Sequence, residues 1–158
     1  LNKKNKKPIQ VVKYLAREKA KSINFKYPQQ LVVGCDTIIL FDNKIIDKVK
    51  DLNSAKKKIK KLSGKEHKII SAVSIYINKK QIWSCIQISK VKIRKLSTKN
   101  INYYISVCGE EILKSAGCYQ IESCGPIIIE NIKGDFFNVM GFPLFPFLLF
   151  LKKFNIKK

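Results

Sequence analysis

Three polar residues follow short apolar segments of this chain, and their side chains suit phosphate chemistry. They are Asp36 after residues 31–35, Lys48 after residues 45–47, and Glu122 after residues 119–121. An ionised carboxylate beside so much apolar surface is costly unless it is paired or binds a metal. Carboxylate oxygens bind Mg²⁺ or Mn²⁺, an ammonium group stabilises charge on a phosphate, and a second carboxylate can deprotonate water. The three residues indicate metal-assisted phosphate chemistry, provided that they converge on one cleft.

Each of the three residues also has a structural interpretation. Asp36 could cap a turn, Lys48 could be a solvated surface lysine, and Glu122 could be an exposed charge at the end of a strand. His67 reads as a structural histidine and Asn138 as a turn residue. Residue type and spacing alone leave these alternatives open.

Hydrophobic periodicity predicts the elements that must position these side chains. Apolar residues recur at helical spacing over residues 8–23, and a second helix starts after a cap at Asp51 or Asn53. A third helix starts after Ser97 or Thr98, and a last one begins near Pro143. Two-residue turns are predicted at positions 42–43 and 78–79. The predicted strands are residues 31–35, 38–41, 44–46, 68–77, 82–93, 119–122 and 126–130. In this interpretation Asp36 ends a buried strand, the place where open α/β sheets bind ligands.

The composition fits one globular domain over residues 1–158 with an unusual charge. The formal net charge is +21, which by itself is typical of a nucleic-acid or anionic-membrane partner. All basic residues except Arg17 and Arg94 are lysines, however, whereas nucleic-acid surfaces depend on Arg for bidentate contacts. We therefore predict a solvated lysine surface that attracts polyphosphates, and no dedicated nucleic-acid interface.

The cysteines and the apolar segments indicate whether the chain binds zinc, in which compartment it lies and whether it spans a membrane. The five cysteines form no Cys-x-x-Cys pair and there is one histidine, so a zinc site is not predicted. The odd cysteine count without a signal peptide predicts reduced thiols in a cytoplasmic protein. The longest apolar stretch, residues 139–151, is too short to span a bilayer and reads as a terminal core helix, so no membrane partner is predicted.

Five sequence blocks follow one another along the chain. They are Gly-Cys-Asp-Thr-Ile (34–38), Ile-Asp-Lys (46–48), Leu-Ser-Gly-Lys-Glu-His (62–67), Ser-Ala-Gly-Cys-Tyr-Gln-Ile-Glu (115–122) and Gly-Asp-Phe-Phe-Asn-Val-Met-Gly-Phe-Pro-Leu (134–144). In this order and spacing they resemble the Maf family, the septum-formation-inhibitor-like nucleoside triphosphate pyrophosphatases. The resemblance extends from Leu-Ala-Arg-Glu-Lys-Ala at residues 15–20 to the final helix.

The resemblance implies an α/β fold, with a mixed twisted sheet, flanking helices and a central cleft. It implies hydrolysis of a nucleoside triphosphate to the monophosphate and pyrophosphate with a divalent metal, Mg²⁺ or Mn²⁺. Asp36 matches the proton acceptor and a metal ligand, and Lys48 matches the phosphate-contacting lysine. Glu122 matches a substrate and metal contact, and Ser71 stands where the family has a threonine, with its hydroxyl retained. A homodimer is possible.

Departures from the family pattern indicate a substrate branch within the family and an expected loss of activity. Ser115 and Glu122 resemble the branch that acts on 7-methyl-GTP, and Val49 replaces the proline that usually follows the lysine. The family's opening Ser-x-Ser-x-Arg-Arg-like loop and a later acidic residue precede the region seen here, so we expect an N-terminally truncated domain with impaired activity. The alternative is a non-catalytic nucleotide- or nucleic-acid-binding protein that keeps the fold.

Overall fold

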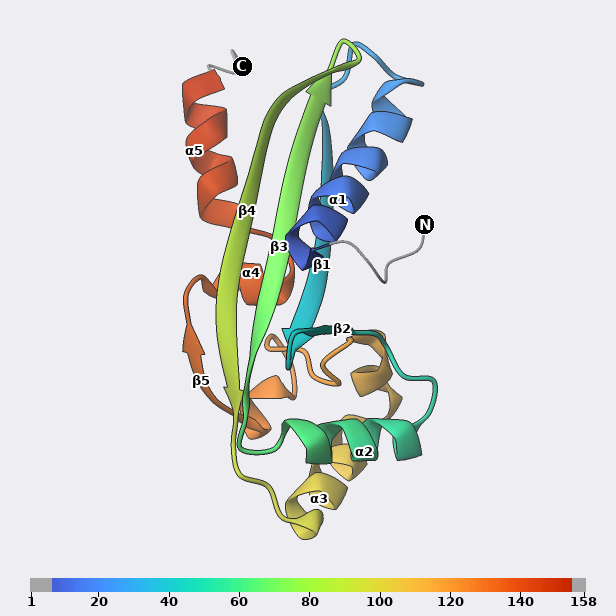
Figure 1. The fold of residues 1–158 in the computed structure, drawn as a ribbon, viewed down its shortest axis with the longest axis vertical. Coiled ribbons are helices and arrows are strands. Elements are labelled where there is room, and N and C mark those ends of the chain that lie inside the picture. Colours follow the sequence, from blue (N-terminus) through green and yellow to red (C-terminus); the bar gives the residue numbers. More distant parts are fainter. Residues whose placement is uncertain (1–6, 155–158) are drawn as a thin grey trace.

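A five-stranded sheet forms the upper and middle part of the molecule in Figure 1, with α1 and α5 beside it and α2 and α3 below it. The computed structural model describes residues 7–154. The strands are β1 (Val32–Phe41), β2 (Lys44–Ile46), β3 (Glu66–Ile77), β4 (Lys80–Ile93) and β5 (Ile129–Lys133), in the order β2-β1-β3-β4-β5. The helices are α1 (Pro8–Asn24), α2 (Leu52–Leu62), α3 (Thr98–Cys108), α4 (Phe136–Met140) and α5 (Leu144–Phe154), with 3₁₀ turns η2 (Gly109–Lys114) and η3 (Gly125–Ile127). The predicted α/β class with flanking helices is confirmed.

Neighbouring strands of the sheet all run in opposite directions, and two-residue turns join two of the four pairs, β1 with β2 and β3 with β4. All four pairings among the described strands are antiparallel, where a mixed sheet was expected. Asp42 and Asn43, between β1 and β2, have φ values of 48° and 59°, and Asn78 and Lys79, between β3 and β4, have 51° and 61°. Positive φ at both central residues is the geometry that matches strand twist in a two-residue hairpin, so both predicted turns are confirmed.

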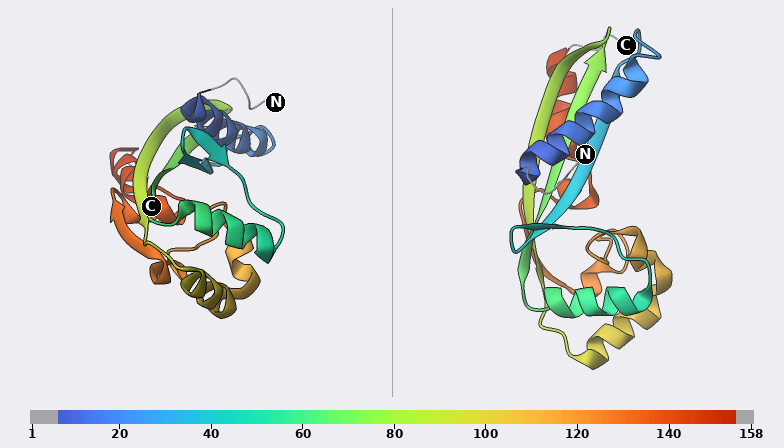
Figure 2. Two further views of the ribbon diagram at one scale, coloured as in Figure 1. Left: turned by 60° about the horizontal axis from the view of Figure 1, so that its bottom comes forward. Right: turned by 45° about the vertical axis from the view of Figure 1, so that its right-hand side comes forward.

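The molecule has two lobes that share the long strands (Figure 2). In the upper lobe of Figure 1, α1 packs on one face of β1 and β3, and α5 packs on the other face. In the lower lobe, α2, α3 and the 3₁₀ turns enclose the largest apolar cluster. Strand β3 contributes to all three clusters: Ile69 to the lower one, Ile70 beneath α1, and Val73 beneath α5.

Helix α1 lies so close to β1 that only glycine fits beneath it. A Cβ atom on Gly34 would lie 2.4 Å from the Ala16 carbonyl oxygen and 2.5 Å from the Ala20 backbone nitrogen. Both atoms belong to the helix backbone and cannot rotate away. The buried face of the helix carries Val12, Ala16 and Ala20, at the helical spacing that the sequence predicts.

The predicted helix caps are confirmed in α2 and α3. The Asp51 carboxylate accepts a 2.7 Å hydrogen bond from the Ser54 backbone N–H. Ser97 and Asn100 form a reciprocal capping box at the start of α3.

The region after α3 differs from the prediction. Residues 119–122, expected as a strand, form an irregular segment that leads into a turn, and the strand expected over residues 126–130 is Ile129–Lys133, preceded by η3. The Gly125 N–H donates to the Gln120 carbonyl oxygen at 2.8 Å and closes a loop over residues 120–125; Ile121 within it and Tyr119 just before it are both buried. The alternating burial of residues 119–122 therefore comes from a folded loop rather than from a strand.

Two further predictions are corrected by the structure. Asp36 lies inside β1 rather than at its end, because the strand continues through the apolar residues to Phe41. Asn138 lies in the short helix α4, which Asp135 caps by accepting from the Phe137 N–H at 2.9 Å. Within residues 7–154, no helix combines the length and apolar character needed to cross a membrane.

Candidate active site

A cavity of about 270 Å³ lies where the two lobes meet. Its walls come from the middle of β1 and β3, the segment after β2, the loop that follows η2, and α4. Polar groups that line it are Thr37, Lys48, Lys114, Ser115, Gln120 and Glu122, and apolar walls come from Ile39, Ile69, Ala116, Tyr119, Val139 and Met140.

Lys48 and Glu122, two residues predicted from sequence, line this cavity together. Both are solvent-exposed, and they come from segments far apart in the chain. Lys114 adds a second ammonium group, which is paired with Glu111 at 2.7 Å. The cavity therefore presents two ammonium groups, which can bind an anion, and one carboxylate, which can bind a cation that accompanies the anion.

Ser71 lies behind the cavity wall and reaches it through Thr37. The hydroxyls of Ser71 and Thr37 are 2.8 Å apart, and the Thr37 hydroxyl donates to the Gly141 carbonyl oxygen at 3.0 Å. Ser71 is fully buried and does not line the cavity, whereas Thr37 does. Thr37 was not singled out from the sequence, although it sits in the Gly-Cys-Asp-Thr-Ile block.

Asp36 faces the other side of β1. Successive side chains of a strand point to opposite faces, so Asp36 faces α1 and the adjacent Thr37 faces the cavity. The Lys19 ammonium of α1 donates to the Asp36 carboxylate at 2.5 Å and to the Cys35 carbonyl oxygen at 3.2 Å. The structure thus brings Lys48 and Glu122 together and places Asp36 apart from them. Lys19 was also not singled out, although it lies in the Leu-Ala-Arg-Glu-Lys-Ala block.

Buried hydrogen bonds hold the loop that carries Glu122. The Tyr119 hydroxyl is 2.6 Å from His67 Nε2, and the Tyr104 hydroxyl donates to the Cys118 carbonyl oxygen at 2.9 Å. Burial lowers the pKa of His67 to about 4 and raises the pKa of Tyr119. A neutral histidine in hydrogen-bond contact with a buried tyrosine agrees with the structural interpretation of His67.

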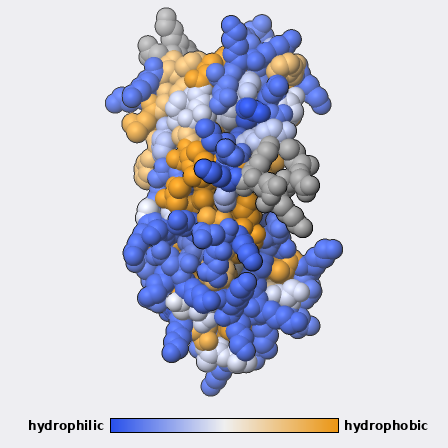
Figure 3. Space-filling view, in the orientation of Figure 1, coloured by the Kyte–Doolittle hydropathy of each residue, from blue (hydrophilic) through white to orange (hydrophobic). Residues whose placement is uncertain are grey.

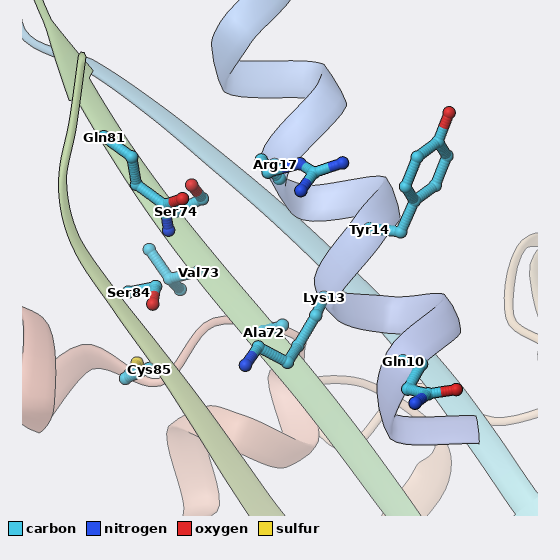
Figure 4. A pocket seen from close by; sticks show the side chains of 10 residues that line it. All are labelled: Gln10, Lys13, Tyr14, Arg17, Ala72, Val73, Ser74, Gln81, Ser84 and Cys85. Carbon is cyan, nitrogen blue, oxygen red and sulfur yellow. The ribbon is translucent and has the colours of Figure 1, made fainter. Parts of the chain in front are cut away.

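A larger cavity, of about 630 Å³, lies on the α1 face of the sheet (Figure 4). Lys13, Tyr14 and Arg17 line it from α1, and Ser74, Gln81 and Ser84 line it from β3 and β4. The Ser74 hydroxyl oxygen is sealed from solvent, so it offers no contact to a ligand. None of the predicted site residues lines this cavity, and we take the smaller one as the candidate site.

The oxygen donors of the smaller cavity indicate how a divalent metal ion could bind there. Among residues 7–154 no cluster of three or more His, Cys, Asp or Glu side chains is arranged to hold a metal ion. Glu122 supplies one carboxylate and Gln120 a neighbouring amide oxygen. Mg²⁺ commonly binds through one or two carboxylates plus substrate phosphates. These residues fit an ion shared with a phosphate ligand better than an ion held by protein alone.

Comparisons with known proteins place this chain in one family and relate it to nucleotide pyrophosphatases. The chain belongs to the Maf-like protein family, whose model matches residues 1–154. A 7-methyl-GTP pyrophosphatase from Bartonella henselae is 37% identical over 153 residues, covering 97% of this chain and 77% of the relative. A dTTP/UTP pyrophosphatase from Pyrococcus furiosus is 38% identical over 141 residues, covering 89% and 73%. A nucleoside triphosphate pyrophosphatase from Ruegeria sp. is 31% identical over 144 residues, covering 91% and 72%.

Proposed function

We propose that this chain is a nucleoside triphosphate pyrophosphatase, a hydrolase that cleaves the anhydride between the α- and β-phosphates. The observation that carries the proposal is the convergence of Lys48 and Glu122 on one cavity. Family membership and the names of the relatives support the same reaction.

Lys48 and Lys114 would hold the triphosphate and offset the negative charge that grows on the leaving pyrophosphate. Glu122, with Gln120 beside it, would hold a divalent ion together with the phosphate oxygens, and that ion would polarise the phosphate under attack. Thr37 would stay fixed at the cavity wall through its bonds to Ser71 and Gly141.

The proposed proton acceptor lies on the face of β1 that packs against α1. Asp36 remains our proposed base, as the family resemblance implies, but its carboxylate is paired with Lys19 on the opposite face of β1. For Asp36 to act, substrate or water must reach that face of the strand, or the Lys19 contact must open.

Substrate, location and assembly remain proposals. We favour a modified purine nucleotide, because Ser115 and Glu122 match the 7-methyl-GTP branch and a relative with that name is 37% identical over 97% of this chain. The five unpaired cysteines support the predicted reducing, cytoplasmic location. Sedimentation velocity would test the possible homodimer.

The test is pyrophosphate release from 7-methyl-GTP, GTP, dTTP and UTP, with Mg²⁺, Mn²⁺ or EDTA. We expect metal-dependent release, and a loss of about 100-fold in kcat/KM for Lys48→Met, since removing one charge-stabilising donor typically costs this much. Lys50→Met is the matched control, because Lys50 is exposed two residues away and does not line the cavity.

Two results would contradict the proposal. One is the absence of release from every nucleotide with either metal; the other is equal activity of the Lys48→Met and Lys50→Met variants. Salt-sensitive association with DNA or RNA, without turnover, would instead favour the non-catalytic binder.

A further inference from the structure

We propose that Lys58 is a positioning residue that ties together the two chain segments lining the candidate active site. This inference rests on the proposed function, because it concerns the same cavity. Lys58 is one of five lysines on α2 and lines the neighbouring surface beside Phe41 and Ile46.

A single ammonium group makes both contacts. Lys58 Nζ donates to the Ala116 carbonyl oxygen at 3.1 Å and also to the carbonyl oxygen of Asp47. Ala116 lies in the loop after η2, and Asp47 lies in the connection between β2 and α2. These segments are distant in sequence and meet at this side chain.

Both contacts lie next to residues of the cavity. Asp47 directly precedes Lys48, and Ala116 itself lines the cavity beside Ser115. Fixing the two backbone carbonyls fixes the spacing between Lys48 on one wall and the Glu122 loop on the other. The bonds from Tyr104 and His67 hold that loop to the core but do not reach the Lys48 segment.

Helix α2, which carries Lys58, is fixed to the protein core. Its buried face carries Ala55, Ile59 and Leu62, which belong to the lower core, and Asp51 caps its start. Lys58 precedes Ile59, so its backbone moves with a core residue. Lys58 is half-buried, and its ammonium makes charge-assisted bonds to neutral carbonyls, which are stronger than bonds between two neutral groups.

The experiment compares Lys58→Met, Lys58→Arg and the exposed control Lys60→Met in the whole chain, by hydrogen exchange and by pyrophosphate release. We expect Lys58→Met to increase amide exchange about tenfold in residues 47–49 and 115–118, while exchange in α1 and β3 stays as in the wild type. We expect kcat/KM to fall about tenfold, mainly through a higher KM, because both walls of the phosphate site are displaced. Arg can donate to two carbonyls, so Lys58→Arg should recover most of both losses.

The outcomes separate this inference from the proposed function. If Lys58→Met matches Lys60→Met in both measurements, or if exchange rises equally throughout the chain, Lys58 does not position the site. The inference also fails if Lys58→Arg behaves like Lys58→Met. If the wild type hydrolyses no nucleotide but the local exchange changes appear, the positioning role stands and the proposed function falls.

Discussion

The side chains of the neighbouring residues Asp36 and Thr37 lie on opposite faces of β1. Asp36 is paired with Lys19 beneath α1, and Thr37 lines the cavity with Lys48 and Glu122. Single substitutions at these two positions can therefore show on which face of β1 the phosphate is attacked.

Asp36→Asn tests the proposed proton acceptor. We expect kcat to fall at least about 100-fold, the usual contribution of a general base. The free energy of unfolding should change by less than about 1 kcal/mol, because Lys19 is 57% exposed and the Asn amide oxygen can still accept from it. Kinetics and urea unfolding measure the two quantities.

Thr37→Val is the comparison on the cavity face. A mutant pair in which Thr37→Val loses turnover while Asp36→Asn keeps it would remove Asp36 from the mechanism. It would place the chemistry on the face that carries Lys48.

His67 gives the protein a defined response to acid. Burial lowers its pKa from 6.5 to about 4, so between these values the unfolded chain binds a proton that the folded chain does not. Stability should be unaffected by His67 above pH 6.5 and should fall as the pH drops toward 4, by about 3 kcal/mol in total.

The effect can be isolated because the chain has a single histidine. We expect His67→Gln, which keeps a hydrogen-bonding group near Tyr119, to lose this part of the pH dependence of the unfolding free energy. A wild type and a variant with the same slope between pH 6.5 and 4 would contradict the assigned pKa.

At the level of elements, the contact between α1 and β1 is the most constrained. We expect Gly34→Ala to destabilise the fold by about 3 kcal/mol, since the added Cβ meets helix backbone at 2.4 Å. Gly64→Ala is the control, because no atom lies closer than 4.0 Å to its Cβ and only its φ of 71°, just after the end of α2, opposes the change, at a cost of about 1 kcal/mol. Equal unfolding midpoints for the two variants would show that α1 can shift.

The elements set by local physics were predictable from sequence. The two hairpin turns follow from Asp, Asn and Lys at two-residue junctions, and the starts of α2 and α3 follow from Asp51 and Ser97. The loop around Glu122 was not predictable, because Tyr119 is buried by distant partners, His67 and the lower core. The face on which Asp36 lies was likewise open, since strand alternation does not say which face carries the cavity.

At the scale of the whole molecule, the net charge of +21 creates a long-range field. Hydrophilic residues cover most of the visible lower lobe, in which α2 exposes Lys57, Lys60 and Lys61 (Figure 3). A triphosphate should be drawn toward such a surface, and salt screens the attraction, with a Debye length of about 10 Å at 0.1 M.

Added KCl should therefore lower kcat/KM several-fold between about 0.02 and 0.3 M, through KM, with kcat nearly constant. Choline chloride at matched ionic strength controls for specific effects of potassium. Values of KM that do not depend on salt would show that the lysine field does not contribute to substrate capture.

Strand β3 supplies residues to all three apolar clusters found among residues 7–154, with Ile69, Ile70 and Val73 each belonging to a different one. Because β3 packs in the interior of both lobes, unfolding of one lobe would disturb the strand on which the other lobe packs. The two lobes form one cooperative unit, and heating should produce a single melting transition. Damage remote from the nucleotide site should consequently lower the population of active molecules as a whole.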